Sequence, residues 1–242
     1  MRAAIVTGVS RGLGESLAAA LLQHGFTVVG VGRASSARLT GDRYRFAKVD
    51  LASAERIAAE LAPAFGTLAA ENPASVCLIN NAAQATPVGL LGTLADSDMA
   101  SSLAVNLVAP VALANLFCRS FGPRGGSRRI INVSSGAAQK PLPGDAMYCM
   151  GKAGLEMLTA TLAAEQHGDG FEAITVRPGI IDTGMQAFAR AQSREALPCV
   201  DMFVEFHSQG RLVPPDTVAA KIVDRLVLGE VENGRTYAYQ EL

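Results

Sequence analysis

The sequence predicts an α/β fold with a doubly wound, mostly parallel sheet and helices on both faces, formed as one domain by residues 1–242. Short strand-like apolar runs alternate with Ala- and Leu-rich helical stretches from end to end, which is the pattern of β-α crossovers. The runs are almost continuously apolar, as expected for a sheet covered on both faces. A glycine-rich turn directly after the first run is the third observation. No repeat, linker or low-complexity tract divides the chain.

Seven strands follow from these runs, and they are predicted at Ala3–Val6, Phe26–Val31, Tyr44–Val49, Ser75–Asn80, Arg129–Val133, Glu172–Val176 and Arg235–Tyr239. The predicted helices are Gly14–His24, Ala54–Ala70, Asp98–Phe121, Asp145–Gln166 and Asp216–Leu228. Pro63 and Pro110 lie inside two of them and are expected to break or kink each helix. Residues 184–213 depart from the alternation and mix apolar with polar residues, as a lid over a site does. Ordinary core packing is the alternative for that segment.

Composition excludes several classes of function. With 49% hydrophobic and 18% charged residues the chain is globular, and a net charge of -1 offers no field for nucleic acid. The four cysteines form no C-x-x-C pair, so neither a metal site nor a disulfide framework is predicted. The chain opens on a strand rather than a leader or membrane span, so a cytoplasmic location without a membrane anchor is expected.

The first predicted strand runs into Thr7-Gly8-Val9-Ser10-Arg11-Gly12-Leu13-Gly14 and then into a helix. Glycines at such a turn allow positive φ and close approach of a pyrophosphate, which the helix N-terminus then binds. The spacing is not G-x-G-x-x-G, and a turn without a ligand is the alternative. Strand, turn and helix in this order favour a Rossmann-type dinucleotide site.

The second strand ends at Arg33, where NAD-binding sites usually carry a carboxylate for the ribose. With Arg11 in the glycine turn, two guanidinium groups are available for a 2′-phosphate, which favours NADPH. Two solvated arginines are the alternative.

Tyr148 and Lys152 lie four residues apart in a predicted helix and so share one face. Ser134 and Ser135 follow a strand at the sheet edge where such folds bind ligands. Reduction of a ketone needs a proton donor, and an ammonium at ~4 Å supplies the roughly 4 kcal/mol that lowers a tyrosine pKa from about 10 to ~7. Ser135 would donate to the carbonyl oxygen. Each residue alone could be an ordinary cap or surface side chain; the combination favours catalysis.

These motifs resemble the short-chain dehydrogenase/reductase family over nearly the whole chain: Thr7–Gly14, Asn80-Asn81-Ala82-Ala83, Asn106, Ser135, Tyr148-x-x-x-Lys152 and Pro178-Gly179. The resemblance implies a homodimer or homotetramer with Tyr148 as acid/base, Lys152 on the nicotinamide ribose, Ser135 on the carbonyl and Asn106 supporting Lys152. Cofactor contacts are implied for Gly8, Ser10, Arg11, Gly12, Leu13, Gly14, Arg33, Asp50, Leu51, Asn81, Ala82, Tyr148, Lys152, Pro178, Gly179, Ile181 and Thr183. The usual Asn-Asn-Ala-Gly ends in Ala83 here.

Within the family the chain resembles the sepiapterin reductase branch and its bacterial benzil reductases. Ala238 stands where the pterin-anchoring aspartate of animal sepiapterin reductases aligns, so an aromatic or α-dicarbonyl substrate is expected. Asp182 or Asp201 could replace that anchor. The alternatives are reduction of a pterin, a sugar or a 3-oxoacyl carrier conjugate, the last through a basic patch of Arg124, Arg128 and Arg129, and an NADPH sensor without redox activity.

Overall fold

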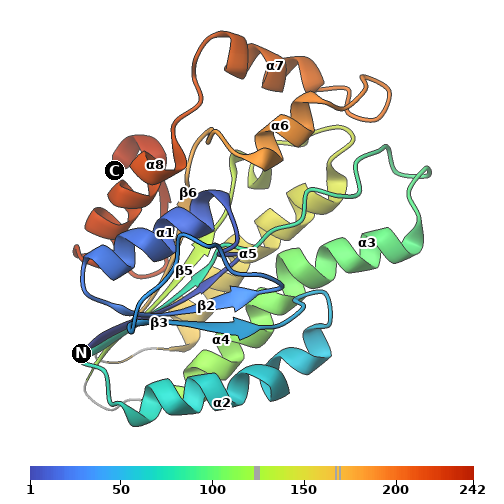
Figure 1. The fold of residues 1–242 in the computed structure, drawn as a ribbon. Coiled ribbons are helices and arrows are strands. Elements are labelled where there is room, and N and C mark those ends of the chain that lie inside the picture. The colour runs from blue at the N-terminus through green and yellow to red at the C-terminus, as the bar shows by residue number, and fades with distance from the viewer. Residues whose placement is uncertain (123–125, 167, 169) are drawn as a thin grey trace.

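A computed structural model describes residues 1–242 except 123–125, 167 and 169. Its core is a seven-stranded sheet in the order β3-β2-β1-β4-β5-β6-β7, with every neighbouring pair parallel (Figure 1). The strands are β1 Arg2–Thr7, β2 Thr27–Gly32, β3 Tyr44–Lys48, β4 Ser75–Asn80, β5 Ser127–Val133, β6 Phe171–Arg177 and β7 Thr236–Ala238. The predicted Rossmann-like α/β class is confirmed.

The strand order reverses between β1 and β4, which lie side by side at the centre of the sheet. Ligands of open α/β sheets bind beyond the carboxyl ends of the strands at such a reversal. In this chain the glycine turn follows β1 and Asn81 follows β4, so both leave the sheet at the same point.

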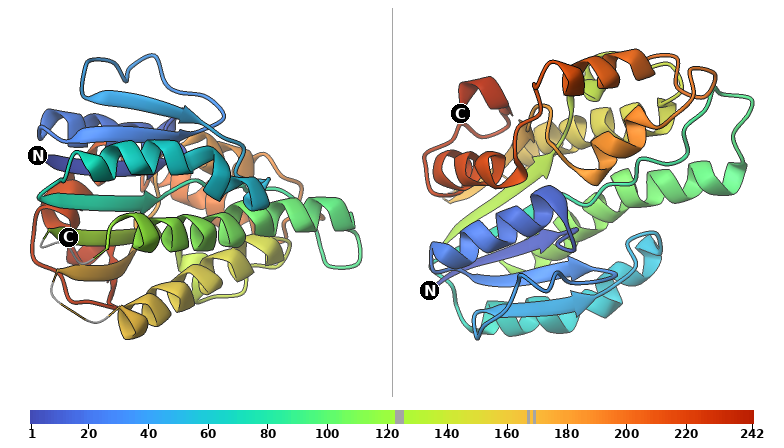
Figure 2. Two further views of the ribbon diagram at one scale, coloured as in Figure 1. Left: turned by 90° about the horizontal axis from the view of Figure 1, so that it is seen from below. Right: turned by 45° about the horizontal axis from the view of Figure 1, so that its top comes forward.

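Helices cover both faces of the sheet (Figures 1 and 2). Helices α1 (Gly12–Gln23) and α8 (Pro215–Ile222) pack on one face, where Leu17, Leu21 and Ile222 are fully buried. The other face carries α2 (Ile57–Ala70), α4 (Ala109–Ser120) and α5 (Ala146–Glu165). The remaining helices are α3 (Asp96–Leu103), α6 (Gly184–Arg190) and α7 (Val200–Ser208). Short 3-10 turns lie at Ala54–Arg56, Gly136–Ala138 and Tyr239–Glu241, and π turns at Ala104–Val108 and Val223–Val227.

The prediction is wrong for Pro63, which does not break α2, whereas near Pro110 the α-helix is interrupted by a π turn. Pro63 lies on the exposed side of α2, and Ile57, Leu61 and Phe65 hold the opposite side in the core. Pro110 directly follows the π turn Ala104–Val108, whose wider backbone does not require the hydrogen bond that proline cannot donate.

The helical run from Asp96 to Ser120 is, by length and a hydropathy of 1.7, of the kind that could cross a membrane. Its apolar character has a structural reason within the fold. Leu113, Leu116 and Phe117 are buried against α2 and the sheet. Figure 2 shows α3, at its start, extending beyond the other elements.

The connection between β2 and β3, residues 33–43, contains no helix. Parallel strands usually need a longer crossover with a helix. Here Leu39, 4% exposed, fills the core beside α1 in place of one. Side-chain contacts fix the loop to its surroundings, namely Ser35 Oγ with Tyr44 OH at 2.6 Å, Ser36 with the Glu15 carboxylate, and Arg38 with both Asp216 oxygens at 2.9 and 3.2 Å.

Candidate active site

The turn after β1 is shaped by three glycines with different requirements. Gly8 and Gly12 adopt φ of 76° and 61°, a region that favours glycine. Gly14 has an ordinary φ, but a Cβ there would overlap the Gly8 carbonyl oxygen and meet the Asn81 amide. The N-cap residue Arg11 places no side-chain cap on α1, which leaves the first-turn amides directed toward an anion.

The exit of β4 is fastened to the exit of β1 by Thr7. Its hydroxyl accepts hydrogen bonds from the backbone N–H groups of Asn81 at 3.0 Å and Ala82 at 2.9 Å. The Asn81 amide donates to the Thr7 carbonyl at 2.9 Å. The sequence analysis did not single out Thr7 for this role, although its place before Gly8 is where such a clamp has to lie.

Two predicted phosphate ligands, Arg11 and Arg33, are exposed and make no ion pair in the part of the chain that the structure describes. Both guanidinium groups are therefore available to a ligand. Asp50 follows β3 and accepts from the Ala52 N–H at 3.1 Å, while Leu51 is buried. Ser10 is exposed at the turn and Leu13 is packed under it.

Ser135, Tyr148 and Lys152 come together at the carboxyl end of β5. Ser135 caps the 3-10 turn Gly136–Ala138, with its hydroxyl accepting from the Ala137 N–H at 3.2 Å, and its side chain lies close enough to Tyr148 to lower the pKa of the phenol. Lys152 is 2% exposed, and its Nζ donates to the Val133 carbonyl at 2.7 Å and lies 5.4 Å from the centre of the Tyr148 ring. The helix therefore presents tyrosine and lysine on one face, directed at the end of β5.

The pKa values in this cluster differ from the sequence expectation. Burial lowers the pKa of Lys152 to about 8, because the ammonium loses hydration. Burial and the Asp145 carboxylate raise the pKa of Tyr148 to about 12, against a smaller lowering by its Ser135 hydrogen bond. Lys152, which was expected to lower this pKa toward 7, is not among the causes of the shift, and its Nζ donates to the Val133 carbonyl. Tyr148 is thus a protonated phenol at neutral pH.

Asn106 is fully buried at the π turn and is bonded to the segment after β4. Its Oδ1 accepts from the Gln84 N–H at 2.8 Å, and its Nδ2 donates to the Gln84 carbonyl at 2.9 Å and Ser102 Oγ at 3.2 Å. Gly151, next to Lys152, lets α5 approach it, because a Cβ there would lie 2.7 Å from the Asn106 Cβ. Asn106 thereby packs against α5 at Gly151. Its predicted support of Lys152 stays a prediction.

The segment after β6 carries four further predicted residues, of which Thr183 lies at the glycine turn. Thr183 lies against Gly12, since a Cβ on Gly12 would be 3.3 Å from its methyl carbon. Pro178 is buried and Gly179 adopts a φ of 79°, while Ile181 pairs with Val213 in an isolated bridge. Arg177, before Pro178, is held by the Glu156 carboxylate at 2.8 and 2.6 Å, a buried anchor that the sequence analysis missed.

Residues 184–213 form α6 and α7, which lie together at the top of Figure 1. Gln186 donates to the Phe203 carbonyl at 3.1 Å, and the rings of Phe203 and Phe206 meet edge to face at 6.4 Å. The apolar residues expected in a lid, Met185, Phe188, Met202, Phe203 and Phe206, are all partly buried rather than core residues. Their role over a substrate stays a prediction.

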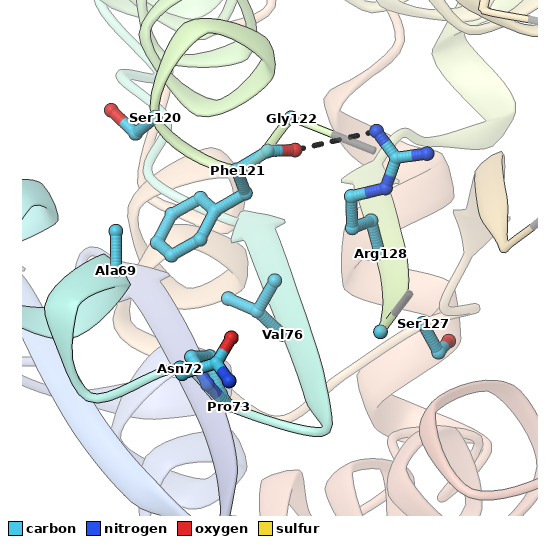
Figure 3. A pocket seen from close by; sticks show the side chains of 10 residues that line it. Ala69, Asn72, Pro73, Val76, Ser120, Phe121, Gly122, Ser127 and Arg128 are labelled. Carbon is cyan, nitrogen blue, oxygen red and sulfur yellow. Dashed lines mark hydrogen bonds between the residues drawn. The ribbon is translucent and has the colours of Figure 1, made fainter. Parts of the chain in front are cut away.

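A small hollow of about 30 Å³ lies at the opposite edge of the sheet, where β4 and β5 begin (Figure 3). Phe121 and Val76 line it, and the Phe121 carbonyl accepts from Arg128 at 3.3 Å. The hollow has the size of a single water and is remote from Tyr148, so it belongs to the packing of the strand starts.

The basic patch considered for a carrier protein is not formed by its two described members. Arg128 and Arg129 are 9% and 8% exposed, and Arg129 is bonded to Glu172 and to the carbonyls of Leu226 and Gly229. Arg124 lies outside the described residues.

Comparison with known proteins identifies the family. A profile described as short chain dehydrogenase matches residues 2–194. The chain belongs to the short-chain dehydrogenase family. It is 31% identical to the benzil reductase ((S)-benzoin forming) of Bacillus subtilis (strain 168) over 98% of both chains. It is 29% identical to the sepiapterin reductase of Xenopus tropicalis over 95% of this chain and 93% of that one. The crystal structure of the KRED1-Pglu enzyme superposes with a TM-score of 0.84 at 26% identity, covering 98% of this chain and all of that one.

As a short-chain dehydrogenase, the protein is an oxidoreductase, and the enzymes of its family bind nicotinamide cofactors. The resemblance to this family and to its benzil and sepiapterin reductases is confirmed. The dehydrogenase motifs converge at the carboxyl edge of the sheet, although the roles of individual residues stay predictions.

Proposed function

We propose that this short-chain dehydrogenase is an NADPH-dependent carbonyl reductase that reduces one carbonyl of an aromatic or α-dicarbonyl compound. The observation that carries the proposal is the placement of Ser135, Tyr148 and Lys152 at the strand end beside the glycine turn. An NADPH sensor without redox activity would not need the buried Lys152 beside the Tyr148 ring, so that alternative is the weaker one.

The residues at the turn fit a dinucleotide. Gly8 and Gly14 keep the backbone open where side chains would collide, and the uncapped start of α1 suits the pyrophosphate. Arg11 and Arg33 are the residues that would hold a 2′-phosphate, with Asp50 and Leu51 toward the adenine. Asn81 and Ala82 would line the adenosine ribose, and Ile181 and Thr183 the carboxamide.

The bound cofactor supplies the hydride. Tyr148, protonated at neutral pH, donates its phenolic proton to the oxygen that becomes an alkoxide. Ser135 donates a hydrogen bond to the same oxygen, which strengthens as negative charge develops. Lys152 would hold the ribose, and its ammonium stabilises the negative charge left on the Tyr148 oxygen. Asn106 fixes the segment after β4 through its hydrogen bond with Gln84.

The substrate class rests on the benzil reductase relative and on apolar neighbours of Tyr148. Leu142, Ala146 and Met147 precede it, and α6 and α7 add methionine and phenylalanine. Burial of aromatic surface there contributes roughly 25 cal/mol per Å². A pterin is the second candidate because sepiapterin reductases are also relatives, but Ala238 offers it no carboxylate.

We also propose a cytoplasmic location and a homodimer or homotetramer. All four cysteines are free thiols, which supports a reducing compartment.

The direct test is cofactor oxidation by the purified protein with benzil, 1-phenyl-1,2-propanedione, sepiapterin and a 3-oxoacyl thioester. We expect the highest kcat/KM on the two diketones, with one carbonyl reduced and the other retained in the product. A tenfold preference for sepiapterin would overturn the substrate assignment and direct attention to Asp182 or Asp201 as its anchor.

Tyr148→Phe is expected to lower turnover at least about a hundredfold while NADPH still binds, because only the proton donor is removed. Tyr237→Phe serves as the matched control, because the Tyr237 hydroxyl accepts from the Glu232 N–H and not from a residue of the site. Near-normal turnover of the Tyr148 variant would remove this residue from the mechanism.

A further inference from the structure

Asp145 lies directly before α5, the helix that carries the candidate acid. Tyr148, Cys149 and Lys152 follow it by three, four and seven residues, the spacing that places side chains on one face of a helix. This helical spacing places the Asp145 carboxyl group near Tyr148 and Cys149, and its charge contributes to raising the pKa of both. The carboxyl group is therefore part of the surroundings of the reacting oxygen.

The Asp145 carboxyl group lacks the hydrogen-bond partner that a side chain at the N-cap of a helix normally has. An N-cap aspartate usually accepts a hydrogen bond from the first turn of its helix, worth about 1 kcal/mol. Asp145 makes no such bond, and in the described part of the chain no other hydrogen bond to its side chain is present. Only its backbone is engaged, with its N–H donating to the Leu142 carbonyl at 3.0 Å.

Three segments enclose the residue. Gly144 packs so closely on the Ala196 carbonyl that a side chain would overlap it, and its own carbonyl accepts from the Gly89 N–H at 2.9 Å. Of the titratable groups facing Asp145, Tyr148 and Cys149 lie on α5 and Cys199 precedes α7. The segment 84–94 has none, Lys140 and Glu195 are exposed, and Arg194 is paired with Asp201. No cation among the described residues neutralises Asp145.

Burial raises the pKa of Asp145 to about 7. A carboxyl group with this property is a hydrogen-bond donor below neutrality and an acceptor above it. In its charged form it also raises the pKa of Tyr148, so a substrate oxygen that keeps it neutral would ease the proton transfer as well.

We propose that Asp145, whose carboxyl group has no hydrogen-bond partner among the described residues, determines substrate specificity by hydrogen-bonding the second oxygen of an α-dicarbonyl compound. Ser135 and Tyr148 hold the oxygen of the carbonyl that is reduced, and in a vicinal dicarbonyl the second oxygen is on the next carbon. An unpaired donor in an otherwise apolar surrounding favours a substrate with an acceptor at that place over one without it. This inference rests on the proposed carbonyl reduction and names its substrate class.

The test compares benzil with deoxybenzoin, which replaces one of its two carbonyl groups by a methylene. The measured quantity is the ratio of kcat/KM for benzil to that for deoxybenzoin. Asp145→Leu, which keeps the branching at Cγ but removes the donor, is expected to lower this ratio about tenfold. Asp145→Asn, whose amide still donates, should keep it within about threefold, as should Glu195→Gln, a change of an exposed acid between α6 and α7.

The pH profile gives a readout that a structural role would not move. In the natural protein the ratio should fall as the pH rises through about 7, because the Asp145 donor is lost, whereas in Asp145→Asn it should stay flat. This profile also decides the question if Asp145→Leu fails to fold. A ratio that is the same in all variants and at every pH overturns the role of Asp145 while leaving carbonyl reduction standing. Failure of the natural protein to reduce either ketone refutes the proposed function itself.

Discussion

Single side chains decide which cofactor the site accepts. Of the arginines in the loop 33–43, Arg38 is bound to Asp216, whereas Arg33 is exposed and makes no ion pair among the described residues. The two arginines are therefore not equivalent, although the sequence alone shows only their charge. Of these two, Arg33, directly after β2, is the one left free to meet a phosphate.

Arg33→Asp is expected to raise KM for NADPH at least tenfold and to change KM for NADH much less, because a carboxylate repels the 2′-phosphate. Steady-state kinetics with both cofactors measures this. Arg43→Asp makes the same charge change in the same loop and serves as the control. Equal use of NADH and NADPH by the natural protein would contradict the phosphate argument.

The residue scale also marks what sequence can predict about the site. The spacing of Tyr148 and Lys152 on one helix and of Ser135 after a strand follows from periodicity, and the structure brings the three together. The pKa of Tyr148 in the protein alone is raised by burial and by Asp145, and neither contribution can be obtained from spacing.

Among the elements, α5 and the π turn Ala104–Val108 form the support of the candidate site. Their contact is close because Gly151 faces Asn106 without a side chain. The sequence indicated the helices, Asn106 and an interruption near Pro110, but not that the interruption is a π turn before the proline. A π turn has no simple pattern in sequence, since it arises where the packing of α5 and the segment after β4 demands it.

Gly151→Ala is expected to destabilise the protein by about 1–3 kcal/mol, since the added methyl group would lie 2.7 Å from the Asn106 Cβ and push α5 away. Urea unfolding measures the change. Gly66→Ala in α2 is the matched control, because nothing lies within 4 Å of its Cβ position, and it should stabilise by about 0.5–1 kcal/mol. Equal stability of Gly151→Ala and the natural protein would show that α5 can move away from Asn106 without an energetic cost.

On the scale of the whole molecule, one face is unusually apolar for an exposed surface. Val108 in the π turn and Val111 in α4 are 47% and 43% exposed, and Met150 and Met157 are 47% and 67% exposed on α5, which packs against the π turn. Exposed apolar patches of this kind are typical of association surfaces. A second copy of the chain is the occupant that the predicted homo-oligomer requires.

Met157→Glu combined with Val111→Glu is expected to shift the protein toward the monomer, because two charges per subunit would be buried without partners. Light scattering coupled to size-exclusion chromatography measures the mass. Leu228→Glu, an exposed apolar residue after α8 on the other side of the sheet, should leave the mass unchanged. A natural protein that is already monomeric would refute the oligomer.

The fold as a whole was accessible from the sequence, because seven apolar runs and their order dictate a parallel sheet. The helix-free connection between β2 and β3 is visible in the sequence only as a short gap between two predicted strands. How that gap is closed depends on Leu39 and on long-range contacts with α1 and α8 that no local pattern contains.

That helix-free connection bears on the thermodynamics of cofactor binding. A loop of residues 33–43 fastened at Ser35, Ser36 and Arg38 has already lost most of its conformational freedom when the chain folds. Binding then requires little further ordering of the backbone beside Arg33, so more of the gross interaction energy remains as affinity. Isothermal calorimetry would register this as a small entropic penalty at the adenosine end, and loosening the loop through Asp216 would enlarge it.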